Sequence, residues 1–168
     1  MANSSIISKA KNIIIKELIK NRQILLAIDS KSMDINTPEK YINTHIFNYH
    51  QNPYTLNDAM TFITIQVHIP NSFVYGDYSS TFVKPVVEIW IISNEKHMNV
   101  DNIPKVKENR NDYIAELIDQ QFNGRLDFGY GELILQTNIE GAFQHSYLYR
   151  KLTFEVIDIN KSLCRDEI

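Results

Sequence analysis

The stretch from Asn109 to Asn160 constrains the fold most, because its pattern predicts one helix followed by two strands. The helix is expected from Asn109 to Phe122, and Asn123-Gly124 provides its end because glycine adopts the left-handed backbone common there. Its apolar residues recur at helical spacing on one face: Tyr113, Ile114, Leu117, Ile118 and Phe122. Its charged residues are expected on the other faces: Arg110, Asp112, Glu116 and Asp119.

Two strands are expected after this helix. The first runs from Glu132 to Asn138, and a polar break at 138–141 ends it. The second runs from Tyr147 to Asn160, with alternating apolar residues on one side: Leu148, Leu152, Phe154 and Val156. An amphipathic helix that packs on an antiparallel hairpin is a unit that can fold.

The first 28 residues predict another amphipathic helix, which Ser4 or Ser5 can cap. Its apolar stripe is broad: Ile6, Ile7, Ala10, Ile13, Ile14, Leu18, Leu25 and Ile28. Five basic residues against one acidic residue give this helix a positive charge: Lys9, Lys11, Lys16, Lys20 and Arg22 against Glu17. Such a charge is typical of a solvated face whose lysine stems cover apolar surface, or of a dock for an acidic surface.

The segment 29–58 is less regular, and it is interpreted as an irregular insertion or a short helix. Thr37-Pro38-Glu39 favours a helix start that continues to about Asn43, because proline suits the first helical turn. Gln51-Asn52-Pro53 is typical of a turn.

Two further strands are expected in the middle of the chain. Thr61 to Pro70 alternates apolar and polar residues, which predicts a strand with one buried face. Thr81 to Ser93 is the second strand, and Pro85 indicates an edge or a bulge because proline donates no hydrogen bond. Polar loops are expected at 71–80 and 94–109.

Because strands follow one another directly along the chain, antiparallel pairing is favoured and the expected fold class is α+β. Residues 1–168 are expected to form a single domain with a mainly antiparallel sheet of about four strands. An N-terminal helix and a second helix between the strand pairs would pack on this sheet. Residues 161–168 are expected to be a C-terminal tail.

Charge and composition narrow the function classes. The net charge of -3 gives no clustered basic surface of the kind that binds nucleic acid. Cys164 is the only cysteine, so no disulfide framework forms within the chain. No apolar run approaches the roughly 20 residues that a membrane span needs, so no membrane partner is expected.

No residue pattern predicts catalysis, a metal site or a cofactor, so a protein without enzyme activity is expected. The five histidines include no pair at the spacing of a helical zinc site: His45, His50, His68, His97 and His145. The glycines at 124, 129 and 131 precede a strand and lack the lysine of a phosphate loop. Two alternatives remain open: a small hydrolase that uses His68 or His145, and a binding module that uses tyrosines for a peptide or polysaccharide.

The order of elements resembles a known family. The first helix is followed by the strands MTFITIQVHIP and KPVVEIWIIS, by the helix NRNDYIAELIDQQFNG, and by the strands FGYGELILQTN and YLYRKLTFEVIDIN. In this order the chain resembles the tail terminator, or tail-completion and neck, proteins of long-tailed bacteriophages. The resemblance covers about residues 59–160 and the first helix, whereas 29–54 match nothing in that family.

The resemblance implies a virion protein, assembled in the host cytoplasm, that forms a homo-oligomeric ring, usually a hexamer, at the end of the tail tube. The expected partners are the tail tube protein and the head–tail connector proteins, and DNA would pass through the ring without specific binding. A head–tail adaptor or stopper, or a baseplate component, is the alternative within the virion.

The two polar loops are the expected contact surfaces of such a subunit. The residues predicted to lie at a subunit or partner interface are Lys96, His97, Asp101, Lys105, Lys107, Tyr75 and Tyr78. The loop 94–109 mixes charged residues with few apolar ones, so we expect it to be mobile in the isolated subunit and ordered on a neighbour. An ordinary solvent-exposed loop is the alternative.

Overall fold

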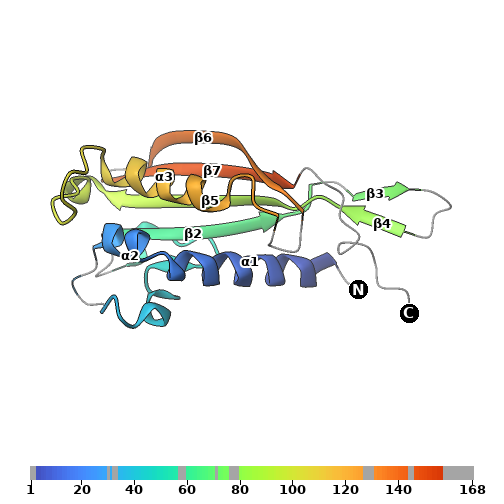
Figure 1. The fold of residues 1–168 in the computed structure, drawn as a ribbon, viewed down its shortest axis with the longest axis horizontal. Helices are drawn as coiled ribbons and strands as arrows, with labels where there is room; N and C mark the ends of the chain where they lie inside the picture. The colour runs from blue at the N-terminus through green and yellow to red at the C-terminus, as the bar shows by residue number, and fades with distance from the viewer. Residues whose placement is uncertain are drawn as a thin grey trace.

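A five-stranded sheet organises the computed structural model, which describes residues 3–29, 31, 34–56, 60–70, 72–75, 80–126, 131–143 and 146–156. The strand order is β1-β2-β5-β7-β6 (Figure 1). The bounds are Ile46–Phe47 for β1, Thr61–His68 for β2, Val86–Asn94 for β5, Leu133–Phe143 for β6 and Tyr147–Val156 for β7. All neighbouring strands are antiparallel except β1, which runs parallel to β2.

The α+β fold class is therefore confirmed, but the main sheet has five strands where about four were expected. The additional strand is β1, which comes from the segment 29–58. Only two residues of it pair with β2, so its periodicity is too short to predict. The rest of this segment contains the short 3-10 helices η1 (Pro38–Tyr41) and η2 (Pro53–Thr55), so a short helix after Thr37 is confirmed.

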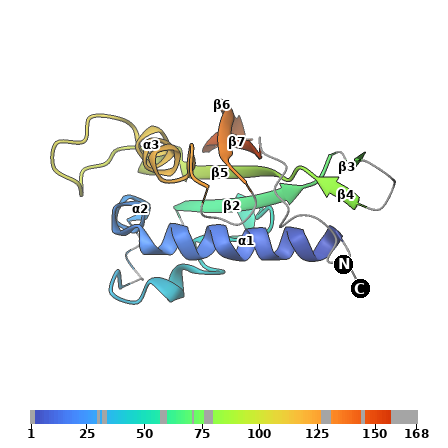
Figure 2. The ribbon, with the colours of Figure 1, turned by 45° about the vertical axis from the view of Figure 1, so that its right-hand side comes forward.

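Three helices cover one face of the sheet: α1 (Asn3–Lys20), α2 (Arg22–Ile28) and α3 (Arg110–Phe122) (Figure 2). The single helix expected to reach Ile28 is in fact two helices, because the helical conformation is interrupted at Asn21. The Asn21 side chain accepts hydrogen bonds from the amides of Gln23 and Ile24 and so caps α2.

The core lies between the helices and the sheet. Buried helix residues of this core include Leu18, Ile24, Ile114, Ile118 and Phe122. Buried strand residues include Ile63, Ile65, Ile89, Leu152 and Phe154. The apolar stripes predicted for α3 and β7 thus face each other, and the rings of Phe122 and Phe154 lie 6.3 Å apart between centroids.

The opposite face of the sheet carries a second, smaller cluster of aromatic side chains. Its members are Phe47, Phe62 and Ile92, with Leu56, Trp90, Phe143, Tyr147 and Tyr149 packed against them. Phe62 and Thr64 are fully buried, so the prediction of one buried face for 61–70 is wrong. The cause is tertiary, because the side chains of Phe47, Leu56 and Tyr147 from other segments pack against this side of the sheet around Phe62.

The strand β6 is longer than expected and continues through the polar residues 138–141 to Phe143. Antiparallel pairing with β7 extends to Phe143 opposite Tyr147, with a register shift between Leu135 and Thr137. Most of 136–142 is exposed, so polar side chains there carry no burial penalty and the predicted break does not occur.

The expected loop 71–80 contains parts of two more strands, β3 (Ser72–Tyr75) and β4 (Ser80–Val83), which pair with each other in a separate sheet. They continue beyond the end of β2 and β5 where His68 pairs with Val86. We call these two strands the arm; Figure 1 shows them at one end of the long axis, and the loop 94–109 at the other.

No helix among the described residues is long and apolar enough to cross a membrane.

Candidate functional site

The loop 94–109 joins β5 to α3 and contains the short 3-10 helix η3 (Glu95–His97). Lys96, Asp101, Lys105 and Lys107 have exposed side chains, as contact residues require. Val100 is buried, and Ile103 packs against the core. The loop thus buries more apolar surface than its composition led us to expect, while its role as an interface stays a prediction.

Arg110, the first residue of α3, anchors this loop to the rest of the protein. Its guanidinium donates hydrogen bonds to the carbonyl oxygens of Ala27, His97 (2.6 Å) and Asn99 (2.5 Å). The side chain is almost fully buried, and burial lowers the pKa of Arg110, although Asp29 and Asp101 oppose this shift.

The expectation that Arg110 lies on the polar side of its helix is therefore wrong. Arg110 precedes Ile114 by four residues and Leu117 by seven, which places it on the apolar stripe. This spacing is the signal in the sequence that could have identified a buried arginine. The spacing does not predict which carbonyl groups accept its hydrogen bonds, because these come from the loop and from α2.

His97 points inward and connects three elements. Its Nε2 lies 3.3 Å from Asp29 Oδ2 at the end of α2, and its Nδ1 lies 2.9 Å from Thr61 Oγ1 in β2. Burial lowers the pKa of His97, the positive charge of Arg110 adds to this effect, and Asp29 opposes it. His97 is therefore an anchor of the loop in the subunit, unlike the four exposed residues with which it was grouped.

The polar contacts continue from Thr61 across the sheet. Thr61 Oγ1 lies 2.9 Å from Ser93 Oγ, which donates to Asn111 Oδ1 at 2.7 Å. Asn111 Nδ2 donates in turn to the Leu148 carbonyl at 3.1 Å. Together with His97, these residues tie α2, β2, β5, α3 and β7 to one another at the end of the sheet that carries the loop.

Asp29, His97 and Thr61 are the residue types of a hydrolytic triad. However, Thr61 is 1% exposed and Ser93 is 0% exposed, so a substrate cannot reach either hydroxyl in this conformation. The arrangement is suited to fixing the loop. Of the histidines considered for a hydrolase, His68 has an exposed side chain and His145 lies outside the described residues.

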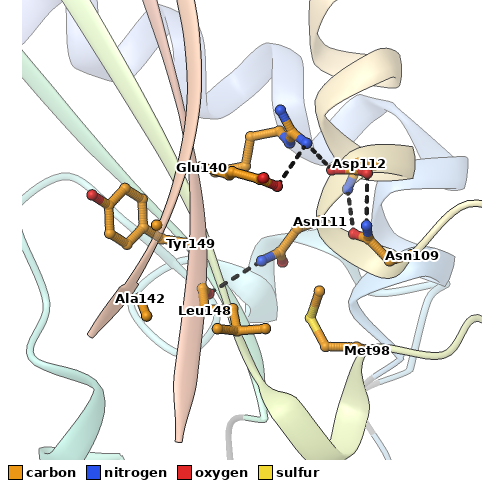
Figure 3. Close-up of a pocket in the computed structure, with 10 residues that line it drawn as sticks. Met98, Asn109, Asn111, Asp112, Glu140, Ala142, Leu148 and Tyr149 are labelled. Atoms are coloured by element: carbon orange, nitrogen blue, oxygen red, sulfur yellow. Dashed lines mark hydrogen bonds and ion pairs between the residues drawn. The ribbon is translucent and has the colours of Figure 1, made fainter. Parts of the chain in front are cut away.

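A groove of about 500 Å³ lies beside the loop, between the start of α3 and the strands β6 and β7 (Figure 3). Its lining includes Met98, Asn111, Leu148, Glu140 and Asp112. Figure 3 shows the Asn111 side chain directed from α3 toward Leu148. Arg150 bridges the two carboxylates, contacting Asp112 Oδ1 and lying 3.3 Å from Glu140 Oε2.

The other predicted contact residues are only partly described. Tyr75 is the last residue of β3, and Tyr78 lies outside the described residues. Within the part of the chain that the structure describes, no cluster of three or more histidine, cysteine, aspartate or glutamate residues could hold a metal ion.

The fold and the charged loop thus define a small α+β protein whose buried polar groups hold its elements together. The chain belongs to the YomW family, whose pattern matches residues 12–156. This membership associates the protein with bacteriophages. No curated protein matches the chain.

Proposed function

We propose that this chain is a structural subunit of the phage neck, similar to a tail terminator, that forms a ring on the tail tube and joins it to the head connector. The observation that carries the proposal is the loop 94–109, which presents exposed charged residues from a firmly anchored base. A phage protein that acts only by assembly needs such a contact surface and no catalytic centre.

Three features support the proposal. Membership of the YomW family fits a phage origin. The order of helix, hairpin, charged loop, helix and hairpin is the order on which the resemblance to tail terminators rests. A net charge of -3 suits a ring through which DNA slides. A basic surface would bind the DNA phosphates, because it would release their counterions.

The first experiment measures assembly. Light scattering and negative-stain electron microscopy of the purified protein, alone and with tail tube protein, should detect rings, with six subunits expected from the resemblance. Both conditions are needed because the tube itself can template the ring. A protein that stays monomeric and leaves the tube ends free in both conditions would contradict the proposal.

The second experiment tests the loop and separates a role in the neck from a role in the baseplate. Serine replaces the exposed residues Lys96, Asp101, Lys105 and Lys107. The apolar residues Val100 and Ile103 stay, as does Asn102, whose side chain donates to the Leu26 carbonyl at 2.6 Å. We expect normal thermal unfolding but no joining of heads to tails in a complementation assay.

The matched control carries serine at four exposed charged positions of other elements, with the same change in net charge: Lys16, Arg22, Lys40 and Glu39. It should join heads to tails normally. If the loop variant also gives complete particles, the loop is not the contact surface. If its tails lack a baseplate but carry heads, the baseplate alternative is correct.

A further inference from the structure

The outer edge of β6 is protected along only part of its length. At its start, the Gly124 amide donates to the Leu133 carbonyl (2.8 Å), and the Leu133 amide donates to the Arg125 carbonyl (3.2 Å). The Leu135 amide donates to Asn123 Oδ1 at 3.0 Å. From Thr137 to Phe143, among the described residues, only β7 pairs with this strand.

The rest of the sheet shows how an edge is usually protected in proteins. The opposite edge is β1, which is only two residues long, and Ile42 forms a bridge to its first residue. By contrast, Thr137–Phe143 is seven residues long, or roughly 23 Å at ~3.3 Å per residue. It contains no proline or lysine, and its only charged residue, Glu140, already contacts Arg150.

The arm also has strand edges that are unpaired among the described residues. Its strands β3 and β4 have four residues each, and no third strand pairs with either of them in the described part of the chain. A two-stranded hairpin alone is marginally stable in water. All eight of its residues are uncharged, and most favour strands: Ser72, Phe73, Val74, Tyr75, Ser80, Thr81, Phe82 and Val83.

The open part of β6 and the arm cannot meet within one subunit. The arm extends from the end of the sheet where His68 pairs with Val86. The open part of β6 lies toward the other end, where Phe143 pairs with Tyr147 and Tyr147 pairs with Asn94 (Figure 1). A contact between them therefore joins different surfaces of two copies, which generates a ring or a filament.

We propose that the arm of one copy adds a strand to the β6 edge of the next copy at Thr137–Phe143. Backbone hydrogen bonds would supply the affinity, as in other cases of strand addition. The groove beside Glu140, Gly141 and Ala142 borders this edge and would receive alternate side chains of the added strand. The inference deepens the proposed function and rests on one part of it, namely that copies of this chain assemble with one another.

Cross-linking tests the contact directly. In a chain that carries Cys164→Ser, one set of variants carries Thr137→Cys or Ile139→Cys, and a second set carries Ser72→Cys or Ser80→Cys. Each member of the first set is mixed with each member of the second, and a short bis-maleimide is added. We expect heterodimers of one β6 variant with one arm variant, identified by mass spectrometry.

The control for position is Glu155→Cys, which has an exposed side chain but lies on β7, between two other strands. It should not cross-link to the arm variants. Cross-links of β6 variants only to themselves would show symmetric pairing and overturn the inference. Rings without cross-links would overturn it and leave the proposed function intact.

A second variant measures association without thiols. Ile139 is 46% exposed and lies opposite Lys151, so Ile139→Glu keeps a favourable neighbour in the free subunit. A charge on the edge should weaken self-association by roughly tenfold or more, while the melting temperature of the monomer stays unchanged.

The matched control is Leu126→Glu, at an exposed apolar position beside the covered start of β6 and outside Thr137–Phe143, and it should associate normally. Equal association by both variants would overturn the inference. Monomers at every concentration would also overturn it, whereas the proposed function would still be decided by binding to tail tubes.

Discussion

Asp29 Oδ2 lies 3.3 Å from His97 Nε2, and this contact joins the end of α2 to the base of the charged loop. Asp29 itself has a left-handed backbone (φ 52°), which ends α2 and directs the carboxylate toward the loop. The same carboxylate lies 3.6 Å from the guanidinium of Arg110. One residue at a helix end therefore helps to position both anchors of the loop.

The first prediction concerns pH. Burial lowers the pKa of both His97 and His45 in the folded protein, and Arg110 adds to the effect at His97. The unfolded chain takes up these protons below about pH 6.5, before the folded chain does. The free energy of unfolding is therefore fully retained above about pH 6.5 and falls below it, by at most about 1.4 kcal/mol per pH unit for each group.

Urea unfolding at about pH 7.5 and about pH 5.5 measures this loss. His97→Gln should reduce the difference between the two values, because glutamine does not titrate. An unchanged difference in His97→Gln would show that His97 does not contribute.

The second prediction concerns the buried arginine. Arg110→Lys should lower the free energy of unfolding by about 2–4 kcal/mol, because one ammonium cannot reproduce the fork that bonds three carbonyl groups. It should also speed cleavage by trypsin at Lys105 and Lys107, since the loop loses its anchor. Arg22→Lys, on the exposed face of α2, is the control and should change neither quantity.

The third prediction concerns the core between α3 and the sheet. Phe154→Ala should lower the free energy of unfolding by about 3–5 kcal/mol, since the side chain is fully buried against Phe122. Glu155→Ala, on the next residue of β7, should change it by less than about 0.5 kcal/mol. A loss below about 0.5 kcal/mol for Phe154→Ala would mean that the faces of β7 are assigned in reverse.

The fourth prediction concerns Gly141, where the ring of Tyr149 lies against the backbone. A Cβ atom added at Gly141 would stand 2.8 Å from Tyr149 Cε1, so the ring must move. That ring packs on Trp90 (4.9 Å between centroids) and on Phe143 (5.1 Å). Gly141→Ala should therefore destabilise the protein by about 1–3 kcal/mol.

The fluorescence of Trp90, the only tryptophan, should change in the Gly141→Ala variant. Ala142→Ser, at the neighbouring exposed position, is the control and should leave the spectrum unchanged. An unaltered spectrum in Gly141→Ala would contradict the packing of Tyr149 against this glycine.

Local periodicity in the sequence determined the elements that bury a single face. The helix that begins after Asn109 and the strand from Tyr147 were predictable because their own spacing of apolar residues matches the helix and strand periods. Asn123-Gly124 marked the helix end because Gly124 has the positive φ (77°) that glycine tolerates. The fold class followed from the order of these elements.

Only the tertiary structure decided what happens where distant segments meet. The strand β2 is buried on both faces because side chains from distant segments, among them Phe47 and Tyr147, pack on its second face. The buried role of Arg110 depends on carbonyl groups from α2 and the loop. Asp29, Thr61 and His97 are far apart in the chain, so no local spacing indicates that they touch. The physical reason is that periodicity records which side of an element is apolar, whereas the partner that covers a side chain is fixed by how the elements pack.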